Sequence, residues 1–149
     1  KWAEPQAKLT IAGEGSQLAE IKKHAGPQIK ILGKVAREKL AELFNQADLL
    51  VLPSVWQENS PLVIYEALAH GLPVLVSDSG GSRELVKEGQ TGWIFKSGDQ
   101  QDLIVKLNYA LAKKAGLANM GQAGRAYVEQ FSLTNYLAKL IALCESLKK

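Results

Sequence analysis

The sequence contains little cysteine and no long apolar run. Cys144 is the only cysteine in 149 residues, which excludes an internal disulfide and fits a reducing compartment. No segment approaches the roughly 18 consecutive apolar residues of a membrane-spanning helix, and the first residues show no signal-peptide pattern. We therefore expect a soluble, cytoplasmic domain in which Cys144 is a small hydrophobic residue of a helix.

Patterns typical of several other protein classes are also missing. The formal net charge is +3, and the basic residues are scattered rather than interleaved with aromatic residues in a stripe. Cysteine and histidine do not occur at zinc-ligand spacing, and the pattern G-x-x-x-x-G-K-[ST] is absent. These absences argue against a nucleic-acid partner, a zinc site and a nucleoside triphosphatase.

Short apolar runs alternate with helical patterns along the chain. The runs are continuously apolar, as in parallel strands that are covered on both faces, and they predict strands at 8–12, 29–32, 49–52, 74–76 and 93–95. Apolar residues at helical spacing predict helices near 18–25 and 40–47, and longer ones near 101–115, 117–130 and 133–147. The alternation predicts a single α/β domain with a doubly wound parallel sheet and a helical C-terminus.

The segment after the third apolar run is suited to begin a helix that binds an anion. Ser60 is a good N-cap and Pro61 a good first helical residue, because proline has no N–H to leave unsatisfied there. The free N–H groups of Leu62 and Val63 would then lie at the positive end of the helix dipole. Such a helix end is a ready site for a diphosphate.

Two glutamates flank this helix start. Glu58 precedes it and is placed to reach the hydroxyls of a sugar, while Glu66 is more than one turn into the helix. A carboxylate that accepts from two vicinal hydroxyls is a common way to bind ribose. Trp56 either walls the sugar subsite or anchors the loop. The glutamates carry little weight alone, because the chain has 15 acidic residues and Ser-Pro is an ordinary helix start.

A second block downstream gives the pattern its specificity. It reads Asp78-Ser79-Gly80-Gly81-Ser82-Arg83-Glu84-Leu85-Val86, followed by Gly89-Gln90-Thr91-Gly92. Together with the E-x7-E pattern of Glu58 and Glu66, it resembles the C-terminal, donor-binding half of family 4 retaining glycosyltransferases (glycosyl transferases group 1). The resemblance implies the Rossmann-like half of a GT-B fold. It also implies transfer of a sugar from a nucleoside-diphosphate sugar, in polysaccharide or glycolipid biosynthesis.

The same resemblance implies roles for the residues of the first block. Glu58 would be the catalytic residue on the donor sugar, Glu66 would bind the ribose, and the amides of Leu62 and Val63 would bind the phosphates. Ser60 is a further donor-binding candidate. No D-x-D pair is present, so the metal clamp of the other large glycosyltransferase fold is not indicated. We expect neither a metal ion nor any other cofactor.

Two glycine-containing turns are further candidates for the donor site. Gly13 and Gly15 follow the first predicted strand in an incomplete dinucleotide fingerprint, and the family has the same glycines at the rim of the nucleotide pocket. The resemblance also implies that the backbone of Lys34 and Val35 lines the nucleobase. For both turns, a tight structural turn that needs no ligand is an equally good interpretation.

The family pattern begins before the first residue of this sequence. Residues 1–5 resemble the frayed end of a helix that follows the family's first, innermost strand, so the first strand–helix unit and its basic phosphate ligands are missing. The predicted strands at 8–12 and 49–52 would each lose a neighbour. We expect a fragment whose sheet edges are compensated by altered pairing, by strand exchange between copies in a homo-oligomer, or by an absent segment.

The fragment is expected to be inactive alone, with the acceptor site on a missing N-terminal domain. Peripheral membrane association of the full enzyme stays open. The apolar stripe between Leu137 and Leu147 packs either on that missing domain or on the core of this one. Two alternative functions are a non-catalytic nucleotide-binding module and a nucleotide-sugar epimerase of the same fold, although such epimerases lack the E-x7-E pattern.

Overall fold

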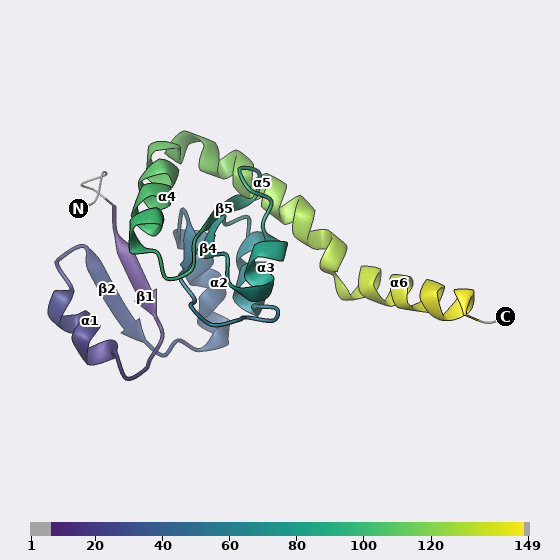
Figure 1. The fold of residues 1–149 in the computed structure, drawn as a ribbon, viewed down its shortest axis with the longest axis horizontal. Coiled ribbons are helices and arrows are strands. Elements are labelled where there is room, and N and C mark those ends of the chain that lie inside the picture. Colours follow the sequence, from purple (N-terminus) through teal and green to yellow (C-terminus); the bar gives the residue numbers. More distant parts are fainter. Residues whose placement is uncertain (1–6, 148–149) are drawn as a thin grey trace.

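The computed structural model describes residues 7–147, and the expectation for residues 1–5 lies outside this range. The chain begins with a parallel β–α–β unit. Strand β1 (Leu9–Ala12) leads into helix α1 (Leu18–His24), which returns the chain to strand β2 (Ile29–Gly33). The two strands pair in parallel from Leu9 opposite Ile29 onward. This unit lies to one side of the larger body of the molecule (Figure 1).

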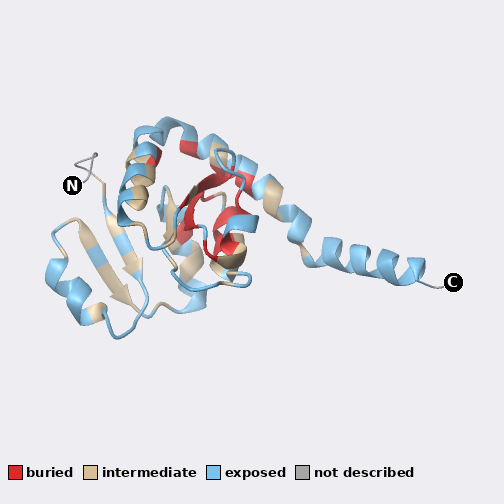
Figure 2. Ribbon diagram, viewed as in Figure 1, coloured by how far each residue is buried: buried red, intermediate tan, exposed pale blue. Residues whose placement is uncertain are grey.

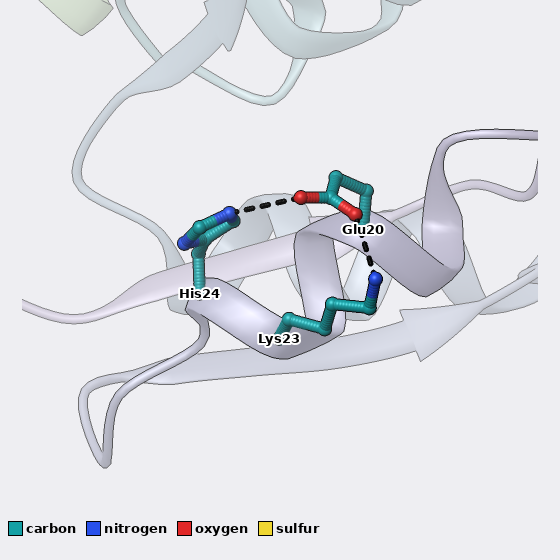
Figure 3. A network of polar contacts seen from close by, with 3 residues as sticks. All are labelled: Glu20, Lys23 and His24. Carbon is teal, nitrogen blue, oxygen red and sulfur yellow. Dashed lines mark hydrogen bonds and ion pairs between the residues drawn. The ribbon is translucent and has the colours of Figure 1, made fainter.

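Helix α1 contributes nothing to the buried core. Its Glu20 carboxylate accepts from the Lys23 ammonium at 3.1 Å and contacts the His24 ring at the same distance (Figure 3). These are one-turn contacts of a helix surface, which stabilise a helix only slightly. All three side chains are exposed, so His24 is a solvated helix residue.

A three-stranded parallel sheet forms the body of the molecule. Its order is β3 (Leu50–Leu52), β4 (Val74–Ser77) and β5 (Gly92–Phe95), with Leu75 of β4 between Val51 and Trp93. Every residue of the central strand β4 is buried, and the buried residues concentrate around it (Figure 2). A continuously apolar strand is stable only when both faces of its sheet are covered.

Helices cover both faces of this sheet. One buried cluster joins Val74 and Val76 to Ile64 and Leu68 of α3, and the other joins Leu75 to apolar residues of the later helices. Side chains of successive strand residues point to opposite faces, so β4 faces both clusters. The helices are α2 (Arg37–Gln46), α3 (Leu62–Ala69), α4 (Gln100–Ala112), α5 (Leu117–Val128) and α6 (Leu133–Ser146), with short 3₁₀ helices η1 (Gly80–Leu85), η2 (Lys114–Gly116) and η3 (Glu129–Phe131).

Helix α5 packs unusually closely against the end of α3. A Cβ added at Gly121 would lie 1.9 Å from the carbonyl oxygen of Gly71, so only glycine permits this approach. Gly71 itself has a φ of 72°, in the left-handed region that glycine adopts without steric cost. The chain can therefore turn directly from α3 into the buried strand β4.

The five strands form two sheets rather than one. Within residues 7–147, β1 pairs only with β2, and β3 pairs only with β4. The predicted loss of a neighbour for the strands at 8–12 and 49–52 is therefore confirmed. A parallel ladder needs a strand about 4.8 Å away, and no described residue provides one for either free edge. The predicted α/β class with helices on both faces is also confirmed.

Helix α6 extends away from the body of the molecule (Figure 1). None of its residues is buried, and Leu137, Leu140 and Ile141 are between 42% and 57% exposed. Cys144 is exposed as well. The interpretation that its apolar stripe packs on the core of this domain is therefore wrong, because α6 follows the bend at η3 outward instead of folding back. None of the described helices is long and apolar enough to cross a membrane.

Candidate functional site

The two sequence blocks meet at the carboxyl edge of the three-stranded sheet. The backbone N–H of Gly81 donates to the carbonyl oxygen of Glu58 at 2.6 Å. A Cβ at Gly81 would lie 1.9 Å from the carbonyl oxygen of Asn59, and one at Gly80 would lie 2.2 Å from that of Glu58. Both glycines are therefore required by backbone contact with the loop that carries Glu58, and η1 holds this loop in place.

The carboxylate of Glu58 is held by the end of the neighbouring strand. The Ser54 hydroxyl donates to Glu58 Oε1 at 2.9 Å, and the carboxylate is part-buried. The carbonyl oxygen of Ser54 in turn accepts from the hydroxyl groups of Ser77 at 2.5 Å and Ser97 at 3.4 Å. Three serines thus fix the backbone that presents Glu58: Ser77 is the last residue of β4, while Ser54 and Ser97 follow the ends of β3 and β5. The carboxyl ends of parallel strands are where α/β sheets bind ligands.

Trp56 is 80% exposed beside this loop. Its carbonyl oxygen accepts from the N–H of Glu58 at 2.9 Å and from the Ser79 hydroxyl. The backbone of Trp56 is thus fixed while its indole ring is left in solvent. The interpretation of Trp56 as a packed loop anchor is wrong, and a wall of the sugar subsite stays a prediction.

Helix α3 begins one residue later than the sequence predicts. Pro61 has a ψ of 109°, which is extended rather than helical, so helical backbone starts at Leu62 and Pro61 takes the N-cap position. The prediction of Ser60 as the N-cap is therefore wrong. Its hydroxyl instead lies 3.0 Å from the Tyr65 hydroxyl. The physical reason is that Pro61, placed just outside the helix, leaves the Ser60 side chain too far back to reach the first free amides.

The shifted start preserves the predicted amide donors. Ile64 N–H donates to the carbonyl oxygen of Pro61 at 3.1 Å. The preceding N–H groups, those of Leu62 and Val63, have no acceptor within residues 7–147, as expected for the first turn of a helix. Leu62 is 64% exposed, and the first turn of α3 follows Glu58 by four residues.

Glu66 lies on α3 with its side chain 28% exposed. Its Oε1 accepts from Nη2 of Arg37, the first residue of α2, at 2.8 Å. Sequence reasoning missed Arg37, because 29 residues separate it from Glu66 and no periodic pattern relates the two. Only the packing of α2 beside α3 brings them together.

The glycine turns lie at the carboxyl end of the two-stranded sheet. Gly13 N–H donates to the carbonyl oxygen of Gly33 at 2.8 Å, which continues the ladder one residue beyond β1. The side chains across this junction, Lys34 and Glu14, form an exposed ion pair at 3.6 Å. Gly13 and Gly33 have φ values of 147° and 69°, so both positions favour glycine for structural reasons.

The structure thus brings the candidate residues together in two groups. Glu58, Leu62, Val63 and Glu66 share one loop and helix at the three-stranded sheet. Gly13, Gly15, Lys34 and Val35 lie in the two loops that follow β1 and β2. The Arg37–Glu66 pair connects the groups, because Arg37 follows Val35 by two residues. Within the described residues, no three side chains of His, Cys, Asp or Glu are grouped as metal ligands.

The comparison with protein families decides the assignment. The family described as "Glycosyl transferases group 1" matches residues 1–127. The chain belongs to this family. The predicted resemblance is therefore confirmed. The group 1 domain described here is 29% identical over 131 residues to the sulfoquinovosyl transferase of Arabidopsis thaliana, with 85% of this chain and 26% of the relative covered.

Two bacterial relatives and two solved structures are also similar to this group 1 domain. An amylovoran biosynthesis glycosyltransferase from Erwinia amylovora is 31% identical (80% of this chain, 32% of the relative). The N-acetyl-alpha-D-glucosaminyl L-malate synthase of Bacillus anthracis is 32% identical (86% and 34%). The Anabaena protein HepE in complex with UDP-glucose has a TM-score of 0.81 at 25% identity (97% and 42%). Sucrose-phosphate synthase from Thermosynechococcus elongatus has 0.80 at 28% (96% and 39%).

The chain corresponds to only part of each relative. The chain spans about a quarter to a third of the curated relatives and about two fifths of the solved chains. The similarity covers nearly all of this chain in both solved structures, and these confirm the α/β fold with its helical C-terminus.

Proposed function

We propose that residues 1–149 are the donor-binding domain of a retaining, two-domain GT-B glycosyltransferase. The observation that carries the proposal is the junction of the two family blocks, where Gly81 holds the Glu58 loop next to the free amides of α3. Membership of the group 1 family and similarity to a UDP-glucose complex support it. The E-x7-E pair favours transfer over the epimerase alternative.

In this proposal each side chain contacts a different part of a nucleoside-diphosphate sugar. The amides of Leu62 and Val63 hold the diphosphate at the positive end of α3. Glu66 accepts from the ribose hydroxyls, and Glu58 contacts the transferred sugar as the catalytic residue. Negative charge develops on the diphosphate as the glycosidic bond breaks, so donors fixed in advance lower the barrier to the reaction.

The remaining candidates complete the donor site. The backbone of Lys34 and Val35 lines the nucleobase, and the turn at Gly13 and Gly15 forms the rim of the pocket. Ser60 precedes the helix start and would bind the donor from the loop that leads into α3. The donor is the only small molecule the proposal requires, without a metal ion or a cofactor.

The proposal extends to the whole enzyme. The acceptor would bind to a separate N-terminal domain, and this chain alone would transfer no sugar. An amylovoran enzyme among the relatives supports a role in polysaccharide or glycolipid biosynthesis. We place the enzyme in the cytoplasm, where nucleotide sugars are available, with peripheral membrane contact if the acceptor is lipid-linked. The free edges of β1 and β3 would be filled by an upstream strand or by strand exchange between copies.

An NMR titration with UDP, GDP and ADP tests the donor site directly. We expect saturable shifts at Leu62, Val63 and Lys34 with one nucleotide, at the millimolar affinity that NMR detects. Glu66→Ala should weaken binding. The matched control is Glu145→Ala, which removes an exposed glutamate from α6. A folded chain that responds to none of the three nucleotides would contradict the proposal and favour a domain without a nucleotide site.

A further inference from the structure

Arg37 contacts Glu66 within a pair of helices that is fixed at a second point. At the far end of α2, Asn45 Oδ1 lies 3.1 Å from His70 Nδ1 at the end of α3. The His70 ring also packs against Phe44 with ring centroids 5.6 Å apart. These contacts hold α2 alongside α3, so that the first residue of α2 lies beside the middle of α3. The position of Arg37 opposite Glu66 therefore follows from helix packing.

The two partners differ in their exposure to solvent. The Glu66 side chain is 28% exposed and that of Arg37 is 76% exposed. The guanidinium therefore reaches the carboxylate from the solvent side. It binds Oε1 at 2.8 Å, whereas Oε2 has no partner within residues 7–147. An ionised carboxylate has lone pairs on both oxygens, so one oxygen stays available for a ligand.

We propose that Arg37 is a positioning residue for the ribose of the donor. It holds Oε1, fixes the rotamer of Glu66 and presents Oε2 to the vicinal hydroxyls. This inference rests on the proposed function, because it assumes that Glu66 binds ribose. It adds a residue that neither the E-x7-E pattern nor the glycine-rich block contains.

The location of Arg37 gives it a second consequence. It follows Val35 by two residues, so the loop that lines the proposed base site leads directly into the residue that orients the ribose acid.

Arg37 contacts Glu66 through one guanidinium nitrogen. Two substitutions at position 37 therefore remove this contact to different degrees. Arg37→Gln removes the charge, while Arg37→Lys keeps a charged group with N–H donors but with a shorter reach. Arg125→Gln is the matched control, because Arg125 is exposed on α5 and forms no ion pair within residues 7–147. The probes are UDP and its 2′,3′-dideoxy analogue, or the corresponding pair for GDP or ADP if that base binds.

NMR titration of these variants gives a readout that a purely structural role would not change. Because the guanidinium of Arg37 is largely exposed, we expect Arg37→Gln to weaken UDP binding only about threefold to fivefold. The dideoxy analogue, which lacks the hydroxyls, should bind the variant and the parent chain equally. Arg37→Lys should recover part of the loss, and Arg125→Gln should bind as the parent does.

Other outcomes would overturn the inference. Unchanged or tighter UDP binding by Arg37→Gln would show that Arg37 is neutral or competes with the ribose. Equal weakening of both probes would show a general charge effect. Failure of the proposed function is distinguishable, because the parent chain would then bind no nucleotide at all, or Glu66→Ala would leave binding unchanged.

Discussion

Gly81 donates its backbone N–H to the carbonyl oxygen of Glu58 at 2.6 Å. The first residue of one sequence block is thereby held by the other block, and the nearby carbonyl oxygen of Asn59 leaves no space for a side chain at position 81. The acid proposed to act on the donor sugar thus depends on a glycine 23 positions later. This relationship makes the geometry of the site sensitive to residues that touch no ligand.

Gly81→Ala should destabilise the domain. Its methyl group would lie 1.9 Å from the carbonyl oxygen of Asn59, so the Glu58 loop must shift. Overpacking of this kind costs about 1–3 kcal/mol, and urea denaturation measures it. Gly116→Ala is the control, because a Cβ there meets nothing within 4 Å. Equal stability of the two variants would show that the loop yields without cost.

Glu58→Gln should separate recognition of the sugar from recognition of the nucleotide. The Glu58 carboxylate is held by Ser54 at 2.9 Å, away from the Arg37–Glu66 pair. We expect binding of the nucleotide that the parent chain accepts to change less than about twofold, and binding of the corresponding nucleotide sugar to weaken about tenfold with the loss of a charged hydrogen bond. Titration of both ligands by NMR provides the comparison. A large loss of affinity for the nucleotide would place Glu58 at the nucleotide instead.

Amide hydrogen exchange should reveal the unpaired edges of β1 and β3. Leu9 N–H donates to Gln28 and Leu50 N–H to Pro73, so the alternating amides of Thr10, Ala12 and Val51 face the free edges. We expect these three to exchange much faster than Leu75 in the buried strand β4.

If an upstream strand fills these edges, as proposed, a longer chain that includes it provides the contrast for this measurement. In that form, Thr10, Ala12 and Val51 should become protected, while Leu75 changes little. Strong protection of all three amides in the 149-residue chain as a monomer would contradict two open edges. The same protection in a dimer would instead support strand exchange.

The stability of the domain should fall at alkaline pH because of Tyr127. Burial, followed by the repulsion of Tyr65, raises the pKa of Tyr127 above its ordinary value of about 10. The neutral phenol is thus favoured in the folded state, so its contribution is fully present below about pH 10 and is lost as the pH rises through the raised pKa. Tyr127→Phe should reduce this loss in thermal denaturation across pH 8–11. Tyr136→Phe, on exposed α6, is the control and should leave the pH dependence unchanged.

The sequence by itself determined the strands, most helices and the family. Continuous apolar runs such as 74–76 predict parallel strands, and β4 extends only one residue further, because burial on both faces requires an apolar residue at every position. The two blocks of motifs identify the family because they depend on local geometry, a helix start and a glycine turn. The start of α3 was misplaced by one residue, since Ser60 and Pro61 permit either position and the packing of the loop decides.

Tertiary structure alone decided which distant residues act together. The contact between Gly81 and Glu58, the three serines behind the Glu58 loop and the pair of Arg37 with Glu66 join positions that no sequence periodicity relates. The outward course of α6 was also beyond the sequence, because its apolar stripe fits a core or a separate partner equally well. Amphipathicity shows that a helix face needs a partner, but only the fold places one within reach or, for α6, leaves the face open to solvent.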